Sequence, residues 1–345
     1  MTRDVAIRSV GLVSSVGLNA AATCGALRAK VTNPTQTRFR GRNGDWVLGH
    51  EVQLPEPWVG IAKLTRMAEL AARDCLDGAG IRPALSVGAI PLLLCTAERE
   101  RPGRLEDLDE RLFADLQGAL GLQVDAQNSA IVPLGRTAVF SALAKARLLI
   151  AGGQAEEVLI VAADGLLSWP ALKSYLDADR ILEDGNCNGF MPGEGAGALL
   201  VAEAKADAEL TCIGFGYSIE PAPLFSDAPL RGDGLTAAVR QALNESGLGP
   251  DDVDFIVADL SGEQYFLKEA ALARARALRG QTRQLELWHP AEGIGEAGAL
   301  GAAAVIAAVW YAVQKGYACG PRVLVHGSSD GEHRFAAIFC AKGVR

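Results

Sequence analysis

Aromatic side chains make up only 6% of the 345 residues, and no dense run of basic residues occurs. A chain so poor in aromatics offers few surfaces on which sugars or single-stranded nucleic acids could stack. Acidic residues outnumber basic ones by 41 to 33, which gives a net charge of −8 and argues against a phosphate-binding surface. Nucleic acid is therefore not an expected partner.

Paired cysteine spacings are also missing. The seven cysteines are scattered without any CxxC, and their odd number predicts free thiols in a reducing compartment. Neither a zinc-binding spacing nor a Walker phosphate loop occurs, so no metal and no cofactor is expected. The N-terminus has no basic stretch followed by a long apolar segment, which with the thiols predicts a cytoplasmic location.

The longest apolar run without charge, Ala297 to Val313, is short for a membrane span and rich in alanine. We expect it to form a helix buried in the core, and we expect no membrane span. Hydrophobic residues make up 49% of the chain and charged residues 21%, which is enough apolar surface for a large core.

Helical and strand patterns alternate along the chain, which indicates an α/β protein. The unbroken apolar run EVLIVAADG (Glu157 to Gly165) predicts a strand buried on both faces. Near residue 205 the pattern restarts, and LTCIGFGYSIE is similar in character to the first strand, DVAIRSVGLVS. We therefore expect two related halves, residues 1–204 and 205–345.

The most specific string is GFMPGEGAGALLV, Gly189 to Val201. Its glycines form G-x-G-x-G and run into a strand, whereas the dinucleotide motif G-x-G-x-x-G opens a helix. By itself the string indicates a turn with close backbone approach. Ketosynthases, the β-ketoacyl-acyl-carrier-protein synthases of the thiolase superfamily, carry a similar segment before a central strand, and the chain resembles them here. VAIRSVGLVSSVGLNAAATCGALRA and GIGEAGALGAAA are similar to further segments of that family.

The resemblance implies a thiolase-like, duplicated α/β/α/β/α sandwich of five layers, which is usually a dimer. It also implies a reaction that needs one nucleophilic Cys at a strand-to-helix turn and two His. The Cys position matches Gly135, give or take one residue, in SAIVPLGRTAVF. The two His positions match Asp259 and Glu292. We therefore expect no confident catalytic residue at these three positions.

Ionised carboxylates cannot replace the two histidines in the family's reaction, and a rescue would require strongly raised pKa values that keep Asp259 and Glu292 protonated. An ionised Asp259 or Glu292 accepts hydrogen bonds and cannot donate them, so it would repel a developing enolate oxygen. Losing one oxyanion donor costs about 3 kcal/mol, and replacing two donors with negative charges costs more. The residues expected around this pocket are Arg136, Thr137, Ser261, Gly193, Glu194, Gly195 and His289.

Two interpretations of the carboxylates stay open. If Asp259, Glu292 and Arg136 converge, they could form a new acid/base site, as in an acyltransferase-type enzyme acting on acyl-ACP or acyl-CoA. The alternative, which we favour, is a structural ion-pair cluster that fills a disused pocket. Thiol chemistry at Cys187 or Cys95 is a weaker possibility, because the sequence places no His beside either residue.

The expected function is therefore that of a β-ketoacyl synthase-like pseudoenzyme without condensing activity. It would act as a partner or accessory protein in a fatty acid or polyketide-type pathway, as a homodimer or as a heterodimer with a ketosynthase-like protein. An acyl chain or an acyl carrier protein is a further possible partner, although the charge of −8 disfavours docking of an acidic carrier protein.

Overall fold

The computed structural model describes residues 4–82, 89–206 and 208–342, and ten of its strands form one mixed sheet. In the first part of the chain these strands are β1 (Val5–Val13), β4 (Leu92–Cys95), β5 (Ala130–Val132), β6 (Glu157–Gly165) and β7 (Glu194–Glu203). In the second part they are β8 (Leu210–Ile219), β9 (Phe255–Ala258), β10 (Glu286–Trp288), β11 (Arg322–Ser328) and β12 (His333–Ala341). A separate hairpin consists of β2 (Thr35–Arg40) and β3 (Trp46–Gly49).

Helices cover the outer faces of this sheet and also pack between its two halves. They are α1 (Ala20–Arg28), α2 (Gly60–Gly78), α3 (Leu108–Leu120), α4 (Ala138–Ala151), α5 (Trp169–Asp177), α6 (Asp233–Ser246), α7 (Gln264–Ala277), α8 (Ala291–Ile294) and α9 (Leu300–Gln314). Among the described residues, no helix combines the length and the apolar character that crossing a membrane requires.

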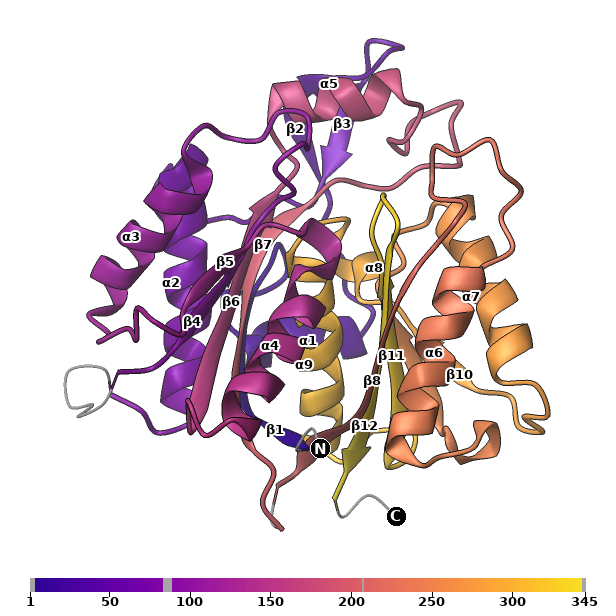
Figure 1. Cartoon of the computed structure of the whole chain (residues 1–345). Helices are drawn as coiled ribbons and strands as arrows, with labels where there is room; N and C mark the ends of the chain where they lie inside the picture. Colours follow the sequence, from indigo (N-terminus) through magenta and orange to yellow (C-terminus); the bar gives the residue numbers. More distant parts are fainter. Residues whose placement is uncertain (1–3, 83–88, 207, 343–345) are drawn as a thin grey trace.

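Five layers follow from the way these helices pack (Figure 1). Helices α2 and α3 share a core with one face of the β1–β7–β6–β4 strands, whereas α6 and α7 share another with β9, β11 and β12. Between the two halves of the sheet lie α4 and α9, which pack against strands from both of them. The predicted α/β sandwich with five layers is thus confirmed.

The two halves of the sheet have the same strand order. Outward from the centre, the first half runs β1-β7-β6-β4-β5 and the second runs β8-β12-β11-β9-β10. Counted along the chain within each half, both orders are first, fifth, fourth, second and third. The halves join where β1 meets β8 in antiparallel pairing, with Val5 opposite Cys212 and Ala6 opposite Thr211.

The same close helix contact occurs in both halves. A Cβ atom added to Gly11 of β1 would lie 1.8 Å from the carbonyl oxygen of Ala71 in α2. A Cβ atom added to Gly216 of β8 would lie 1.9 Å from the carbonyl oxygen of Ala238 in α6. In each half only glycine allows the first outer helix to lie this close to the first strand. These shared features support the division into halves 1–204 and 205–345, which stays a proposal.

The apolar run near the C-terminus forms the buried helix that the sequence predicts. Helix α9 has apolar side chains on every face and packs against α1, α4 and strands of both halves. A helix that is apolar all round is stable only where protein surrounds it. Because α9 begins just after Glu296, it also fixes one side of the site described next.

Candidate functional site

The strand-turn-helix expected around residue 135 is present. Strand β5 leads through a short 3-10 turn, Gly135–Thr137, into α4. Gly135 has a φ of +48°, a conformation that favours glycine. Its amide donates a hydrogen bond of 2.9 Å to the carbonyl of Thr96 at the end of β4. The backbone at this turn is therefore held by the neighbouring strand.

The space beside Gly135 is filled by the carboxyl group of Glu98. A Cβ atom added to Gly135 would lie 2.0 Å from Oε1 of Glu98, and its Cδ and Oε2 would be almost as close. Burial raises the pKa of Glu98, with Arg101 opposing that shift. A side chain at position 135 would have to displace a buried carboxyl group, so this position cannot carry a nucleophilic side chain as it stands.

Replacing Gly135 tests this packing. We expect Gly135→Ala to lower the free energy of unfolding by about 1–3 kcal/mol, because alanine is strained at positive φ and its Cβ meets Glu98. Gly121→Ala is the matched control, since Gly121 has a φ of +62° but open space around its Cβ direction. Thermal unfolding compares the two variants. Equal losses in both would show that Glu98 does not hold the space beside residue 135.

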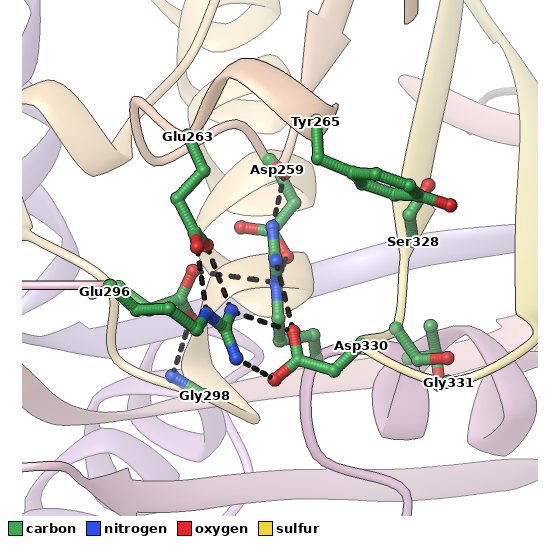
Figure 2. Close-up of polar contacts among 12 residues, drawn as sticks. Asp259, Glu263, Tyr265, Glu296, Gly298, Ser328, Asp330 and Gly331 are labelled. Carbon is green, nitrogen blue, oxygen red and sulfur yellow. Dashed lines mark hydrogen bonds and ion pairs between the residues drawn. The ribbon is translucent and has the colours of Figure 1, made fainter. Parts of the chain in front are cut away.

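Next to Gly135, Arg136 is buried among carboxylates and aromatic carbon. Figure 2 shows the carboxyl groups of Asp259, Glu263, Glu296 and Asp330 gathered in this place. Its Nε lies 3.1 Å from Oδ2 of Asp259, and its Nη2 donates a hydrogen bond of 2.8 Å to the carbonyl of the same residue. Nε also lies 3.4 Å from Oε2 of Glu296, and Nη1 lies 3.8 Å from Oδ1 of Asp330. The guanidinium covers the ring of Phe266, with Cζ 4.3 Å from the ring centroid.

A second arginine extends the same network. Arg180 binds Glu263 through two hydrogen bonds of 2.7 and 2.9 Å and binds Asp330 through two of 2.6 and 3.0 Å. Asp330 therefore lies between Arg180 and Arg136. Although burial acts in the opposite direction, Arg180 and then Arg136 lower the pKa of Asp330, which stays ionised.

A third arginine pairs with the strand beside the site. Arg101 forms a two-pronged ion pair with Asp164 at the end of β6, with distances of 2.7 and 2.6 Å. The same carboxylate accepts a hydrogen bond of 2.9 Å from the amide of Ala299. This carboxylate thus ties the central strand to the start of α9.

Asp259 and Glu296 share Arg136 and cannot both be neutralised by it. Burial raises the pKa of Asp259, against the attraction of Arg136. Burial also raises the pKa of Glu296 to about 7. The positive charge of Arg136 lowers this pKa, and the negative charge of Asp259 raises it and offsets part of that effect. Two buried carboxylates facing one guanidinium leave one negative charge in excess, so one of them holds a proton near neutral pH.

The structure brings together part of the predicted site. Arg136 and Asp259 converge as expected, but Glu292 does not join them. Its side chain is 69% exposed and pairs with His289, with 3.1 Å between Oε1 and Nδ1. The expectation that Glu292 meets Arg136 is therefore wrong, and Glu296, which was not predicted, lies there instead.

The local backbone explains why Glu296, and not Glu292, lies beside Arg136. Helix α8 is only four residues long, and the chain leaves it at Gly295 with a φ of +73°. Residue 296 then pairs with Pro192 in an isolated parallel bridge, and its Oε1 accepts a hydrogen bond of 3.0 Å from the amide of Gly298. In the string GIGEAG an acidic residue lies between glycines, and this pattern indicates a turn at Glu296.

The remaining predicted pocket residues have mainly structural contacts. Thr137 donates a hydrogen bond to the carbonyl of Leu134, and Ser261 interacts with Glu296 and lowers its pKa against the effect of burial. The amide of Gly193 donates to the carbonyl of Glu296 at 2.7 Å.

The other two members of the predicted pocket, Glu194 and Gly195, lie on β7. Glu194 accepts a hydrogen bond of 2.9 Å from the amide of Val52 and pairs with Lys63 at 2.5 Å. A Cβ atom added to Gly195 would lie 2.4 Å from the carbonyl oxygen of Val13 in β1. Glu194 therefore links β7 to Val52 and Lys63, and Gly195 allows β7 to lie close to β1.

The cysteines add no nucleophile to this cluster. Cys95 is fully buried, and burial raises the pKa of its thiol. Cys187 is exposed on the loop before β7 and forms no ion pair or hydrogen bond with the residues that the structure describes. No group of three or more His, Cys, Asp or Glu within the described ranges is arranged to hold a metal ion.

Comparisons with known proteins agree with this picture. No protein-family model matches the chain. It is 41% identical over 113 residues to "Actinorhodin polyketide putative beta-ketoacyl synthase 2" of Streptomyces coelicolor, which covers 31% of this chain and 26% of that protein. A polyketide β-ketoacyl synthase 2 of Streptomyces halstedii is 33% identical over 141 residues, covering 38% of this chain and 33% of its own length. The matched segments thus span a third or less of these relatives.

Solved structures match over nearly the whole chain. The ishigamide ketosynthase/chain length factor has a TM-score of 0.80 at 19% identity and covers 99% of this chain and 100% of its own. A type II polyketide ketosynthase in complex with its acyl carrier protein has a TM-score of 0.81 at 17% identity, covering 99% and 100%. A ketosynthase in complex with its chain length factor from Xenorhabdus doucetiae has a TM-score of 0.76 at 13% identity, covering 98% of each chain.

The fold and the sequence matches define a ketosynthase-like protein with the thiolase-like fold. Its turn at Gly135 has no Cys, and the hydroxyl of Thr137 in the same turn donates a hydrogen bond to the carbonyl of Leu134. Within that class, the chain is similar in sequence to the β-ketoacyl synthase 2 proteins of Streptomyces polyketide pathways.

Proposed function

We propose that this protein is a ketosynthase-like accessory subunit without condensing activity, and that it acts as the partner of an active ketosynthase in a polyketide-type pathway. The observation that carries the proposal is the filled turn at residue 135. Glu98 occupies the space of a side chain there, and Arg136 with its carboxylates occupies the adjoining interior. The cytoplasmic location expected from the sequence is part of the same proposal.

The alternative of an acyl-transferring enzyme has less support. It would use Asp259 or Glu292 as a base, but Asp259 is buried against Arg136, and Glu292 is exposed and paired with His289. Glu296, with a pKa of about 7, has the titration of an acid/base group, but its carboxyl is buried beside Arg136 and Asp259. Paired and buried groups of this kind favour a structural cluster over a substrate site.

A partner is supported by the structural neighbours and by an open edge of the sheet. Two of the neighbours are described as ketosynthases with chain length factors. In the part of the chain that the structure describes, β5 is an outermost strand and pairs only with β4. Open strand edges are ready to pair with another chain, and Ile131 and Leu134 next to this edge are half-buried. We propose this edge as part of the contact with a ketosynthase.

Activity measurements on the full chain test the proposal. With malonyl-acyl-carrier protein or acyl-CoA as substrate, we expect carbon dioxide and free thiol to be released only at the background rate. Turnover that is abolished by Asp259→Asn or Glu296→Gln and retained by Glu292→Gln would overturn it, since Glu292 lies outside the cluster. For the partner, light scattering should show a one-to-one complex with the ketosynthase of the same organism, and Ile131→Lys on β5 should weaken it.

A further inference from the structure

A groove with apolar walls lies on the outer side of the second half of the sheet, away from the arginine cluster. It has a volume of 310 Å³ and lies between α6, α7 and strands β9, β10 and β11, which form the right-hand layers in Figure 1. Leu235 and Val239 of α6 form one wall, and Ile256 and Leu324 form the floor. Pockets of about 300 Å³ and more are typical of small-molecule sites.

One buried polar side chain faces this groove. His326 lies on β11, and its side chain is on the outer face with Leu324, because alternate residues of a strand share a face. The residue is 6% exposed and its ring forms no hydrogen bond with any residue that the structure describes. Ser328, two residues further on the same face, donates a hydrogen bond of 2.7 Å to Glu269. His326 is therefore an unpartnered polar group at the base of a pocket.

An unpartnered imidazole in such a place calls for a hydrogen-bonding ligand. A ligand oxygen that bonds to this ring gains a hydrogen bond that the described residues do not supply. Burial lowers the pKa of His326 to about 4, so its ring is neutral at pH 7 and has one donor and one acceptor nitrogen. A neutral ring suits a hydroxyl or a keto oxygen and does not select a charged group.

The mouth of the groove supplies a positive charge. Arg274 in the last turn of α7 lines it and forms no ion pair with the described residues. Leu267 and Leu287, which are 41% and 37% exposed, lie along the rim, and Ala271 adds an exposed small side chain. The groove thus joins an apolar body, a polar base and a cationic opening.

We propose that this groove binds a medium-chain aliphatic carboxylate that carries a hydroxyl or keto oxygen toward its far end. The carboxylate would lie at Arg274, the chain between the leucines, and the far oxygen at His326. A volume of 310 Å³ is near the lower end of the range of small-molecule sites, so a short or medium chain is favoured over a long one. Among the described residues that line the groove there is no Phe, Tyr or Trp, so an aliphatic chain is favoured over a flat ring.

Binding of 8-hydroxyoctanoate and of octanoate to the full chain, measured by calorimetry at pH 7, tests the proposal. We expect both to bind with one-to-one stoichiometry, and the hydroxylated acid to bind about three- to tenfold more tightly. His326→Leu should remove that preference while keeping octanoate binding. Arg274→Gln should weaken both ligands to a similar degree, whereas Arg279→Gln, which lies outside the groove, should change neither.

A variant that blocks the opening keeps the test independent of the buried histidine. Ala271 is exposed on α7, so Ala271→Trp is compatible with folding and should abolish binding of both acids. Absence of saturable binding to the unchanged protein, or binding that survives Ala271→Trp, would overturn the proposal. Equal affinity for the two acids would refute the role of His326.

Discussion

Replacing Arg136 with methionine should lower the free energy of unfolding by about 3–5 kcal/mol at neutral pH. Methionine can fill much of the same space against Phe266, but it leaves Asp259 and Glu296 buried without a positive partner. Removing one member of a buried ion pair is costly because the remaining charge keeps its desolvation penalty. Arg136→Met should therefore have the largest effect on stability among single substitutions in the cluster.

Two comparisons make this expectation specific. Arg276→Met removes an arginine whose ion pair with Asp233 is about 40% exposed on both sides, and it should cost no more than about 1 kcal/mol. Adding Asp259→Asn and Glu296→Gln to Arg136→Met should restore much of the stability, because no buried charge then lacks a partner. Thermal unfolding at pH 7 measures all variants. A loss as small as that of Arg276→Met would show that the cluster is not held by charge pairing.

The order of elements could be predicted from the sequence because each signal is local. The apolar run after residue 297 predicts a buried helix, and α9 is one. The turn before α4 and the strand β6 were likewise expected, since glycines and unbroken apolar runs determine them within a few residues. The five-layer arrangement needed the family resemblance, because no local pattern says which strands become neighbours.

The composition of the cluster could be predicted only in part. Of the three residues whose convergence was considered, Arg136 and Asp259 meet and Glu292 does not, whereas the contacts of Glu98 with Gly135 and of Glu296 with Arg136 were not expected. The two glutamates are four residues apart, about one helical turn, so a helical alignment cannot separate them. Only the end of α8 at Gly295 decides which of them turns inward.

His326 shows a further limit of sequence reasoning. Nothing in RVLVHGSS distinguishes a histidine with a hydrogen-bond partner from one facing a groove. The difference depends on the small side chains that α7 presents above the strand, about fifty residues earlier in the chain. Side-chain pairing between distant segments is a property of packing, and it appears only when the segments are placed in space.

Glu296→Gln should flatten the dependence of stability on pH. Glu296 has a pKa of about 7 in the folded protein and near 4.5 when unfolded. Between these values the folded state holds a proton that the unfolded state releases, so the stability from this group is full below pH 4.5 and is lost as the pH rises to about 7. A shift of this size corresponds to about 3 kcal/mol. Glutamine stays neutral and carries no such dependence.

The two proteins should therefore be similarly stable at pH 5, and the Glu296→Gln variant should be the more stable one at pH 8. Burial lowers the pKa values of His50 and His326 to about 4, so the stability that these neutral rings contribute is lost as the pH falls. Their contribution is the same in both proteins. Urea unfolding at pH 5, 6, 7 and 8 gives the difference curve, and parallel curves would contradict the shift. When Glu296 holds a proton, Asp259 is the charged one of the two carboxylates beside the Nε of Arg136, so this proton reduces the excess of negative charge around the guanidinium.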